Sequence, residues 1–299
     1  MAADAATRAT AHAKINLALH VVGKRADGYH LLESLVAFAD VGDRLTLTQA
    51  DEDALHLSGP FGPGLEGHDN IVARALALAR RVGGAHGHAI GPFSVELEKN
   101  LPVASGIGGG SADAAAVLRA LLPGLPRAAR EELLGAALGL GADVPMCLDG
   151  RALVARGIGE ALSPLPLFPA LPMVLANPGV AVSTPAIFKA LPTACNGPLP
   201  DGPAQGFDSV DNVVSYLARC RNDLAAPAMS LEPVIAACLH ALQAAGAARS
   251  AMSGSGATCY GLFHDASKAQ RAADAIADAN PGWWVRATFS RPTHHRRAA

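Results

Sequence analysis

The sequence predicts an α+β protein, because patterns typical of strands and of helices are mixed along the chain without the strict β-α-β repetition of a doubly wound fold. Apolar residues occupy every second position in 44–48, 55–58 and 93–98, as in half-buried strands. The spacing in 70–80 and 128–138 is instead that of helices with one buried face. We therefore expect a largely antiparallel sheet combined with helices in the first half of the chain.

The second half predicts a separate domain. Prolines interrupt regular structure between 164 and 172, and we place the domain boundary just before them, which gives domains of 1–160 and 161–290. Strands are expected at 173–176, 259–263 and 283–289, and helices at 231–242 and 267–278. We expect the last residues, 291–299, to form a mobile tail.

The composition is typical of a compact enzyme rather than of a nucleic-acid-binding or membrane protein. The chain has 299 residues, half of them hydrophobic, and a formal net charge of −2, so it is long enough for two domains and lacks a basic excess. The five cysteines are scattered without a CxxC pair, which predicts reduced thiols and no zinc site. No apolar run approaches the ~18 residues of a membrane span, and no signal peptide is recognisable. We expect a cytoplasmic protein with no nucleic-acid or membrane partner, and the sequence does not fix its oligomeric state.

A glycine-rich segment at 101–113 carries the strongest functional signal. Its glycines remove Cβ atoms where a loop must take positive φ and approach a ligand closely. The helix expected next, over 113–122, directs free N–H groups and the positive end of its dipole toward this loop, which favours an anion there. The segment lacks the lysine of a Walker loop and the position of a dinucleotide-binding fingerprint. It therefore predicts a loop that holds a polyphosphate, and hence an enzyme that uses a nucleotide.

The segment PVASGIGGGSAD at 102–113 resembles the second motif of the GHMP kinase superfamily. Other segments narrow the resemblance to the 4-diphosphocytidyl-2-C-methyl-D-erythritol kinases within it: AKINLAL at 13–19, GKRADGYHLLES at 23–34, GADVP at 141–145 and MSGSGATC at 252–259. These segments occur in the order expected for that family. The resemblance implies an N-terminal, ATP-binding GHMP kinase domain similar to domain 2 of ribosomal protein S5, and a ferredoxin-like C-terminal GHMP kinase domain.

The function implied by this resemblance is ATP-dependent phosphorylation of the 2-hydroxyl of 4-diphosphocytidyl-2-C-methyl-D-erythritol, in the non-mevalonate pathway to isoprenoid precursors. Two alternatives share the glycine loop. One is another GHMP small-molecule kinase, such as a homoserine or mevalonate kinase, and the other is a non-catalytic nucleotide-binding regulator on the same fold. The pair Tyr29-His30 argues against the first, and retention of Lys14 and Asp143 argues against the second.

Lys14 and Asp143 are the expected catalytic pair. Asp143 stands between glycine and proline, which hold its backbone outside a regular helix; the residues alone favour a turn cap, and the resemblance favours a general base. Lys14 lies in an apolar strand pattern, where a lysine ordinarily extends along the surface. The resemblance implies that it lies beside Asp143, where its charge keeps the carboxylate ionised and stabilises a forming alkoxide.

The acceptor is expected to be recognised through its cytosine ring and its polar remainder. Tyr29 and Phe188 offer faces for stacking, and His30 offers both hydrogen-bonding senses. Asn16 and Thr184 are small polar residues suited to the methylerythritol or diphosphate portion.

The donor side is expected to consist of the loop and two further residues. The amides of the loop are expected to hold ATP, and its residues are Pro102, Val103, Ala104, Ser105, Gly106, Ile107, Gly108, Gly109, Gly110, Ser111 and Ala112. By resemblance, Lys99 and Asn70 lie near the adenosine end. Mg²⁺ is expected with ATP, with Ser111 as a ligand, although the sequence offers no cage of carboxylates. Ala104 and Ser105 stand where the family commonly has glycine, and Ala112 where a second serine is usual. The glycine-rich segment 253–258 either closes over the phosphates or only turns the chain, and we favour the first.

Overall fold

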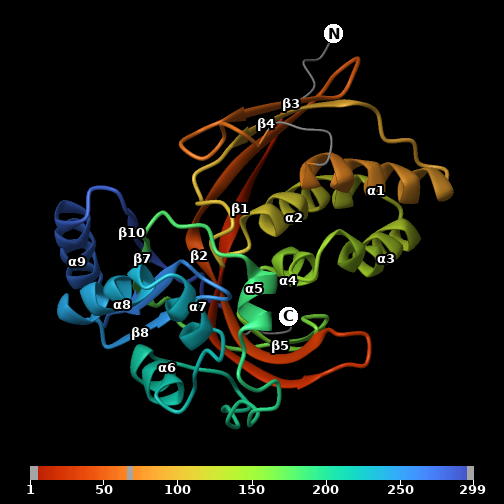
Figure 1. The fold of residues 1–299 in the computed structure, drawn as a ribbon. Helices are drawn as coiled ribbons and strands as arrows, with labels where there is room; N and C mark the ends of the chain where they lie inside the picture. Colours follow the sequence, from red (N-terminus) through yellow and green to blue (C-terminus); the bar gives the residue numbers. More distant parts are fainter. Residues whose placement is uncertain (1–5, 66–69, 295–299) are drawn as a thin grey trace. The chain divides into compact units, whose positions relative to one another are not determined.

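The computed structural model describes residues 6–65 and 70–294, and its ribbon is drawn in Figure 1. The strands are β1 (Thr7–Lys24), β2 (His30–Gln49), β3 (Ala54–Ser58), β4 (Phe93–Glu98), β5 (Leu153–Gly157), β6 (Ala161–Pro164), β7 (Pro172–Asn177), β8 (Arg249–Met252), β9 (Cys259–Leu262) and β10 (Trp284–Phe289). The helices are α1 (Ile71–Ala85), α2 (Gly109–Leu121), α3 (Arg127–Ala136), α4 (Val144–Asp149), α5 (Thr184–Lys189), α6 (Val210–Leu217), α7 (Ala225–Leu231), α8 (Val234–Ala244) and α9 (Ala266–Ala279). Short 3₁₀ turns occupy Leu122–Gly124 and Ala137–Leu140. The α+β class is confirmed.

Most of the predicted elements are present, and the two main differences have local causes. The helix predicted at 231–242 is two helices, because α7 ends at Leu231 and α8 begins at Val234. Pro233 lies between them, and a proline ring cannot continue a preceding helix. The helix predicted at 113–122 begins four residues earlier, at Gly109, so part of the expected glycine loop is helical.

The chain forms two compact units that alternate along the sequence. Among the described residues, the first unit contains 6–13, 41–65, 70–103 and 108–149, and the second contains 14–40, 104–107 and 150–294. Both β1 and β2 begin in one unit and end in the other, which a boundary read from proline content could not reveal. The division at residue 160 into continuous domains remains a prediction.

Within the part of the chain that the structure describes, the first unit contains α1 to α4 and one end of a six-stranded sheet. The end of β2 pairs antiparallel with β4, from Arg44 opposite Glu98 to Gln49 opposite Phe93, and β3 pairs parallel with β4. Since β2–β5 and β5–β6 are also antiparallel, the expected largely antiparallel sheet is confirmed, with β3–β4 as a parallel pair. Helix α2 contacts both α1 and α4. Its buried face is built mainly from alanines between Ala112 and Ala116, whose small side chains allow close approach of neighbouring backbone.

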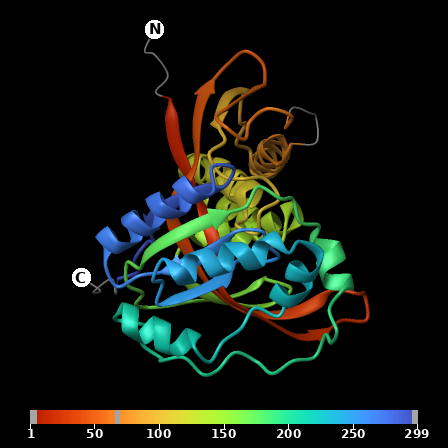
Figure 2. The ribbon, with the colours of Figure 1, turned by 60° about the vertical axis from the view of Figure 1, so that its left-hand side comes forward.

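In the second unit, β7, β8, β9 and β10 form an antiparallel sheet in the order β10-β7-β9-β8. Helices α8 and α9 pack against this sheet, and Figure 2 shows them lying side by side across it. The succession β7, α8, β8, β9, α9, β10 is the β-α-β-β-α-β order of a ferredoxin-like fold. Every residue of β7 is buried, as expected of a central strand. The start of β2 pairs with β5, and β5 pairs with β6.

Residues 291–294 of the predicted tail are among the described residues. Arg291 donates a main-chain hydrogen bond to Phe38, and Thr293 and Phe168 exchange two. Residues 295–299 lie outside the described residues.

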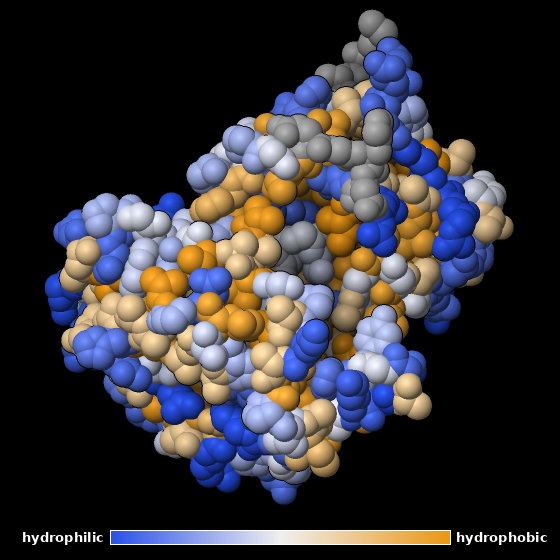
Figure 3. Space-filling view, in the orientation of Figure 1, coloured by the Kyte–Doolittle hydropathy of each residue, from blue (hydrophilic) through white to orange (hydrophobic). Residues whose placement is uncertain are grey.

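Exposed apolar side chains do not gather in one segment. Those with the largest exposure among the described residues are Tyr29, Val103, Leu134, Leu231 and Phe289. Figure 3 shows apolar and polar surface interspersed on the face it draws. Within 6–65 and 70–294 no single helix is long and apolar enough to cross a membrane; α7 and α8 taken together meet the criteria of length and composition, but they are bent by 118°.

Candidate active site

The glycine loop ends in the first turn of α2. Gly108 is the N-cap of this helix and has φ 65°, a left-handed conformation that favours glycine. Gly109, Gly110 and Ser111 follow as the first helical residues. The N–H groups of a first turn have no acceptor within their own helix, and the dipole makes this end positive. This part of the loop therefore has the properties of an anion-binding helix start.

The earlier part of the loop packs against the segment 253–258, and both belong to the second unit. Gly106 and Gly254 have φ of 75° and 55°. A Cβ on Gly106 would lie 2.7 Å from the Gly256 nitrogen, and a Cβ on Gly254 would lie 2.7 Å from the Gly106 oxygen. The Ser253 hydroxyl donates to the Gly106 carbonyl over 3.0 Å. Glycine is thus required on both sides because the two backbones touch.

Lys14 lies on β1 against the same loop. Its main-chain N–H donates to the Ile107 carbonyl over 2.9 Å, and its ammonium donates to the Asn16 side-chain oxygen over 2.8 Å. Lys14 and Asn16 are only 5% and 4% exposed, so this is a buried cation rather than a surface lysine. The Asn16 main-chain N–H donates to the Ser253 hydroxyl. One predicted catalytic residue and one predicted acceptor residue are therefore neighbours of the loop.

Ser111 and Asp143 belong to the first unit, in which α2 packs against α4. Asp143 directly precedes α4, and its carbonyl accepts the Cys147 N–H. A Cβ on Gly141 would lie 3.6 Å from the Ser111 hydroxyl, so the serine of the loop adjoins the segment that contains Asp143. No group of three or more His, Cys, Asp or Glu side chains within the described residues is arranged to hold a metal ion.

Lys99 is buried between two carboxylates. Its ammonium donates to Asp43 and, over 2.6 Å, to Asp113. Burial raises the pKa of the Asp113 carboxyl to about 8; Lys99 opposes this rise and Asp43 adds to it. Burial disfavours the charged form of Lys99, but the two carboxylates outweigh that effect and raise its pKa above the ordinary value. Because Asp43 also accepts the N–H groups of Asn100 and Leu101, this triad joins β2, the start of the glycine loop and α2.

The structure brings His30 and Phe188 together. Their rings are stacked, with centroids 4.7 Å apart and an interplanar angle of 19°. Partial burial, and then the charge of Lys24, lower the pKa of His30, so the ring is neutral at pH 7. Tyr29 is 61% exposed, and the Thr184 hydroxyl hydrogen-bonds the Ser255 hydroxyl over 2.8 Å.

Two other predicted donor residues have evident local roles. The Asn70 side chain caps α1 by accepting the Val72 N–H over 2.9 Å. Ala104 has φ 50°, the left-handed conformation that accounts for the frequent glycine of the family at this position. Pro102 and Ala112 are buried and Val103 is exposed.

Comparisons with known proteins identify the family of this chain. The models of the GHMP kinases N terminal domain and of the GHMP kinases C terminal match residues 70–151 and 212–282. The 4-diphosphocytidyl-2-C-methyl-D-erythritol kinases of Paracoccus denitrificans and Rhizobium meliloti are 52% and 54% identical to this chain, over 96% and 93% of it and 98% and 93% of those proteins. This chain belongs to the 4-diphosphocytidyl-2-C-methyl-D-erythritol kinase family of the GHMP kinases.

Solved structures extend the comparison. A crystal structure of 4-(cytidine 5'-diphospho)-2C-methyl-D-erythritol kinase is 36% identical, has a TM-score of 0.77, and the match covers 95% of this chain and all of that one. The homoserine kinase of Cytophaga hutchinsonii shares the fold. It is 19% identical, with a TM-score of 0.68, and the match covers 99% of this chain and 97% of that one. The GHMP kinases are ATP-dependent phosphotransferases, and this family member is an enzyme that uses ATP as co-substrate.

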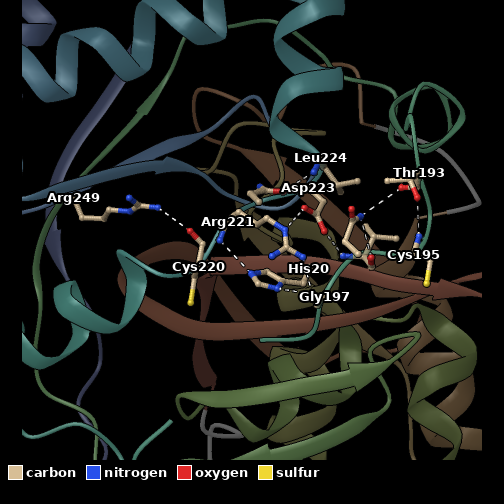
Figure 4. A network of polar contacts seen from close by, with 12 residues as sticks. His20, Thr193, Cys195, Gly197, Cys220, Arg221, Asp223, Leu224 and Arg249 are labelled. Carbon is tan, nitrogen blue, oxygen red and sulfur yellow. Dashed lines mark hydrogen bonds and ion pairs between the residues drawn. The ribbon is translucent and has the colours of Figure 1, made fainter. Parts of the chain in front are cut away.

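This 4-diphosphocytidyl-2-C-methyl-D-erythritol kinase family member also has a supporting network that the sequence did not reveal, shown in Figure 4. His20 accepts the Arg221 N–H, and the Arg221 guanidinium binds Asp223 and the Gly197 carbonyl. The network holds the segment around Asn222 beside β1, and the Asn222 amide donates to the Met252 and Gly254 carbonyls. The two carbonyls that its amide binds are 30 and 32 residues away in sequence, and the local contact of its side-chain oxygen with the Leu224 N–H does not point to them.

Proposed function

We propose that this enzyme transfers the γ-phosphoryl group of ATP to the 2-hydroxyl of 4-diphosphocytidyl-2-C-methyl-D-erythritol, in the non-mevalonate route to isoprenoid precursors. The observation that carries this proposal is the near-complete coverage at 52% identity by a relative with that named activity. The other GHMP kinase considered, homoserine kinase, matches at only 19% identity, which supports a shared fold alone. The two titratable residues of the expected catalytic pair are both present, which favours an enzyme over a non-catalytic regulator.

In the proposed reaction, Asp143 accepts the proton of the acceptor hydroxyl, whose oxygen forms a bond to the γ-phosphorus. The bond between that phosphorus and the β–γ bridging oxygen breaks, and ADP leaves. Lys14 stabilises the negative charge that develops on the acceptor oxygen. The buried state of Lys14 supports this role, because charge interactions are stronger where water is excluded.

ATP is proposed to bind through the glycine loop, with its phosphates toward the start of α2. The left-handed Gly108 and the free amides of the following turn support this assignment. Lys99 and Asn70 remain proposed neighbours of the adenosine end, while their described contacts are with Asp43, Asp113 and Val72.

Mg²⁺ is proposed to accompany ATP. The hard oxygen of Ser111 suits this ion, and the remaining ligands would be phosphate oxygens and water, since Mg²⁺ in kinases is commonly held by few protein ligands. When bound, the ion neutralises charge on the phosphates. We also propose a cytoplasmic location, supported by five cysteines that are all free.

The cytosine ring is proposed to be recognised by Tyr29, His30 and Phe188. A neutral His30 has one donor and one acceptor nitrogen, and cytosine presents both senses on its edge. The exposed Tyr29 ring is accessible for stacking. Asn16 and Thr184 are proposed to bind the remainder of the acceptor.

The test is a coupled assay of the purified enzyme with ATP and a panel of alcohols that includes homoserine, mevalonate and the cytidyl substrate, followed by location of the new phosphate. Phosphorylation of the cytidyl substrate at its 2-hydroxyl is expected. Asp143→Asn should lower kcat by roughly 10²- to 10⁴-fold, the usual contribution of a general base, while ATP still binds. Near-normal turnover by this variant would contradict the role of Asp143, and transfer to another panel member alone would contradict the substrate.

A further inference from the structure

Ser34 lies on β2, outside the residues assigned to either substrate, and we propose that it is a positioning residue for Lys14, acting through the Asn16 side chain. This inference rests on the proposed role of Lys14. It concerns three buried side chains of the second unit, with Lys14, Asn16 and Ser34 exposed by 5%, 4% and 3%.

The contacts form a directed chain. The Lys14 ammonium donates to Asn16 Oδ1 over 2.8 Å, and Asn16 Nδ2 donates to the Ser34 hydroxyl over 2.7 Å. The Ser34 hydroxyl donates in turn to the Ala18 carbonyl over 2.7 Å. The chain therefore begins at a cation and ends at a fixed main-chain oxygen of β1.

The direction of this chain follows from the number of protons available. A hydroxyl has one proton, and Ser34 gives it to Ala18, so toward Asn16 it can only accept. The Asn16 amide must then turn its NH₂ group toward Ser34 and its oxygen toward Lys14. The reverse orientation would direct the NH₂ group at an ammonium that can only donate.

Ser34 fixes the rotation of the Asn16 side-chain amide, which is the conformational freedom that Asn16 retains. The main chain of Asn16 is already held, because its N–H donates to the Ser253 hydroxyl over 3.0 Å. Removal of the Ser34 hydroxyl would leave a buried NH₂ group without its acceptor, which is unfavourable, and the side chain would rotate to recover a partner. Such a rotation withdraws the oxygen that fixes the Lys14 ammonium.

The experiment compares Ser34→Ala with Ser34→Thr and with a matched control, Ser290→Ala. Ser290 is also buried, and its hydroxyl likewise accepts one N–H and donates to one carbonyl, although its N–H donor is the main chain of Leu171 and its acceptor is the Pro169 carbonyl. Ser34→Ala should lower kcat by roughly 10- to 100-fold, the order expected when a reacting group is misplaced, with KM for ATP unchanged. Ser34→Thr should restore kcat because it keeps the hydroxyl, and Ser290→Ala should keep the wild-type kcat.

A second comparison separates this inference from the proposed role of Lys14. In a Lys14→Met background, Ser34→Ala should cause no further loss, since residues that act as a unit are not additive. The inference is overturned if Ser34→Ala keeps the wild-type kcat, if it loses no more than Ser290→Ala, or if it loses the same factor with and without Lys14. Wild-type turnover by Lys14→Met would instead overturn the catalytic role of Lys14 itself. Thermal unfolding of each variant shows that the compared proteins are folded.

Discussion

Asp113→Asn should remove a loss of stability that the wild-type enzyme shows as pH rises. Asp113 is 3% exposed, and one of its oxygens has no hydrogen-bond partner among the described residues, while the other accepts from Lys99. Burial, opposed by Lys99 and reinforced by Asp43, raises its pKa from 3.8 to about 8. The folded protein therefore holds a proton on Asp113 at neutral pH, and an asparagine side chain has nearly the same shape and the same charge.

The sign and size follow from proton linkage. Between pH 3.8 and about 8 the unfolded chain has lost this proton and the folded one keeps it, so the free energy of unfolding falls as pH rises through this interval. One proton changes stability by about 1.4 kcal/mol per pH unit, which over the interval is on the order of 6 kcal/mol. This is a large part of the roughly 5–15 kcal/mol that stabilises a typical protein.

The assay is urea-induced unfolding of wild type and Asp113→Asn at a series of pH values from 5 to about 8, without nucleotide. The difference in the free energy of unfolding should grow in favour of the variant by up to about 1.4 kcal/mol per pH unit. Asp265→Asn is the control, because Asp265 is exposed and its hydrogen bonds, first to Ser267, lower its pKa, so its titration lies below this interval. Its curve should run parallel to that of wild type. Parallel curves for Asp113→Asn as well would refute the reasoning, because they would mean that Asp113 is ionised throughout.

Two further changes test the site. His30→Ala should raise KM for the cytidyl substrate roughly 10-fold, which corresponds to the loss of one or two hydrogen bonds, and should leave KM for ATP unchanged. Steady-state kinetics with each substrate varied in turn would measure both constants, and equal increases in both would contradict the assignment. Ala104→Gly should stabilise the protein by about 1 kcal/mol, because φ 50° is strained for a residue with a Cβ. Urea-induced unfolding would measure the change, and a less stable variant would show that the strain is negligible.

The sequence predicted the elements well where a local signal exists. The alternation of apolar residues located β3 and β4. Pro233 separates α7 from α8. The sequence contains this signal, but the apolar stripe that continues on both sides of the proline predicts one continuous helix. The start of α2 was missed because glycine is a poor helix former, and the first turn here forms despite it.

The pairings that build the site were not predictable in this way. Asp43 and Lys99 are 56 residues apart, and Asn16 and Ser34 face each other only because β1 and β2 pair in a particular register. A register shift of one residue would turn Ser34 to the opposite face of the sheet. Composition and spacing do not encode that choice, so the supporting hydroxyl could be found only in the structure.

The segment 253–258 shows why such a loop consists of small polar residues. Ser253 joins Asn16 to Gly106, the Gly254 carbonyl accepts from Asn222, and Ser255 bonds Thr184. Thr258 donates its N–H to Ser105 and its hydroxyl accepts the Asn177 amide. Each hydroxyl thus fixes a different segment, while Gly254 permits the close approach of the Gly106 backbone. The motif is therefore explained by the protein groups it holds together, and this explanation does not depend on which substrate atoms it also touches.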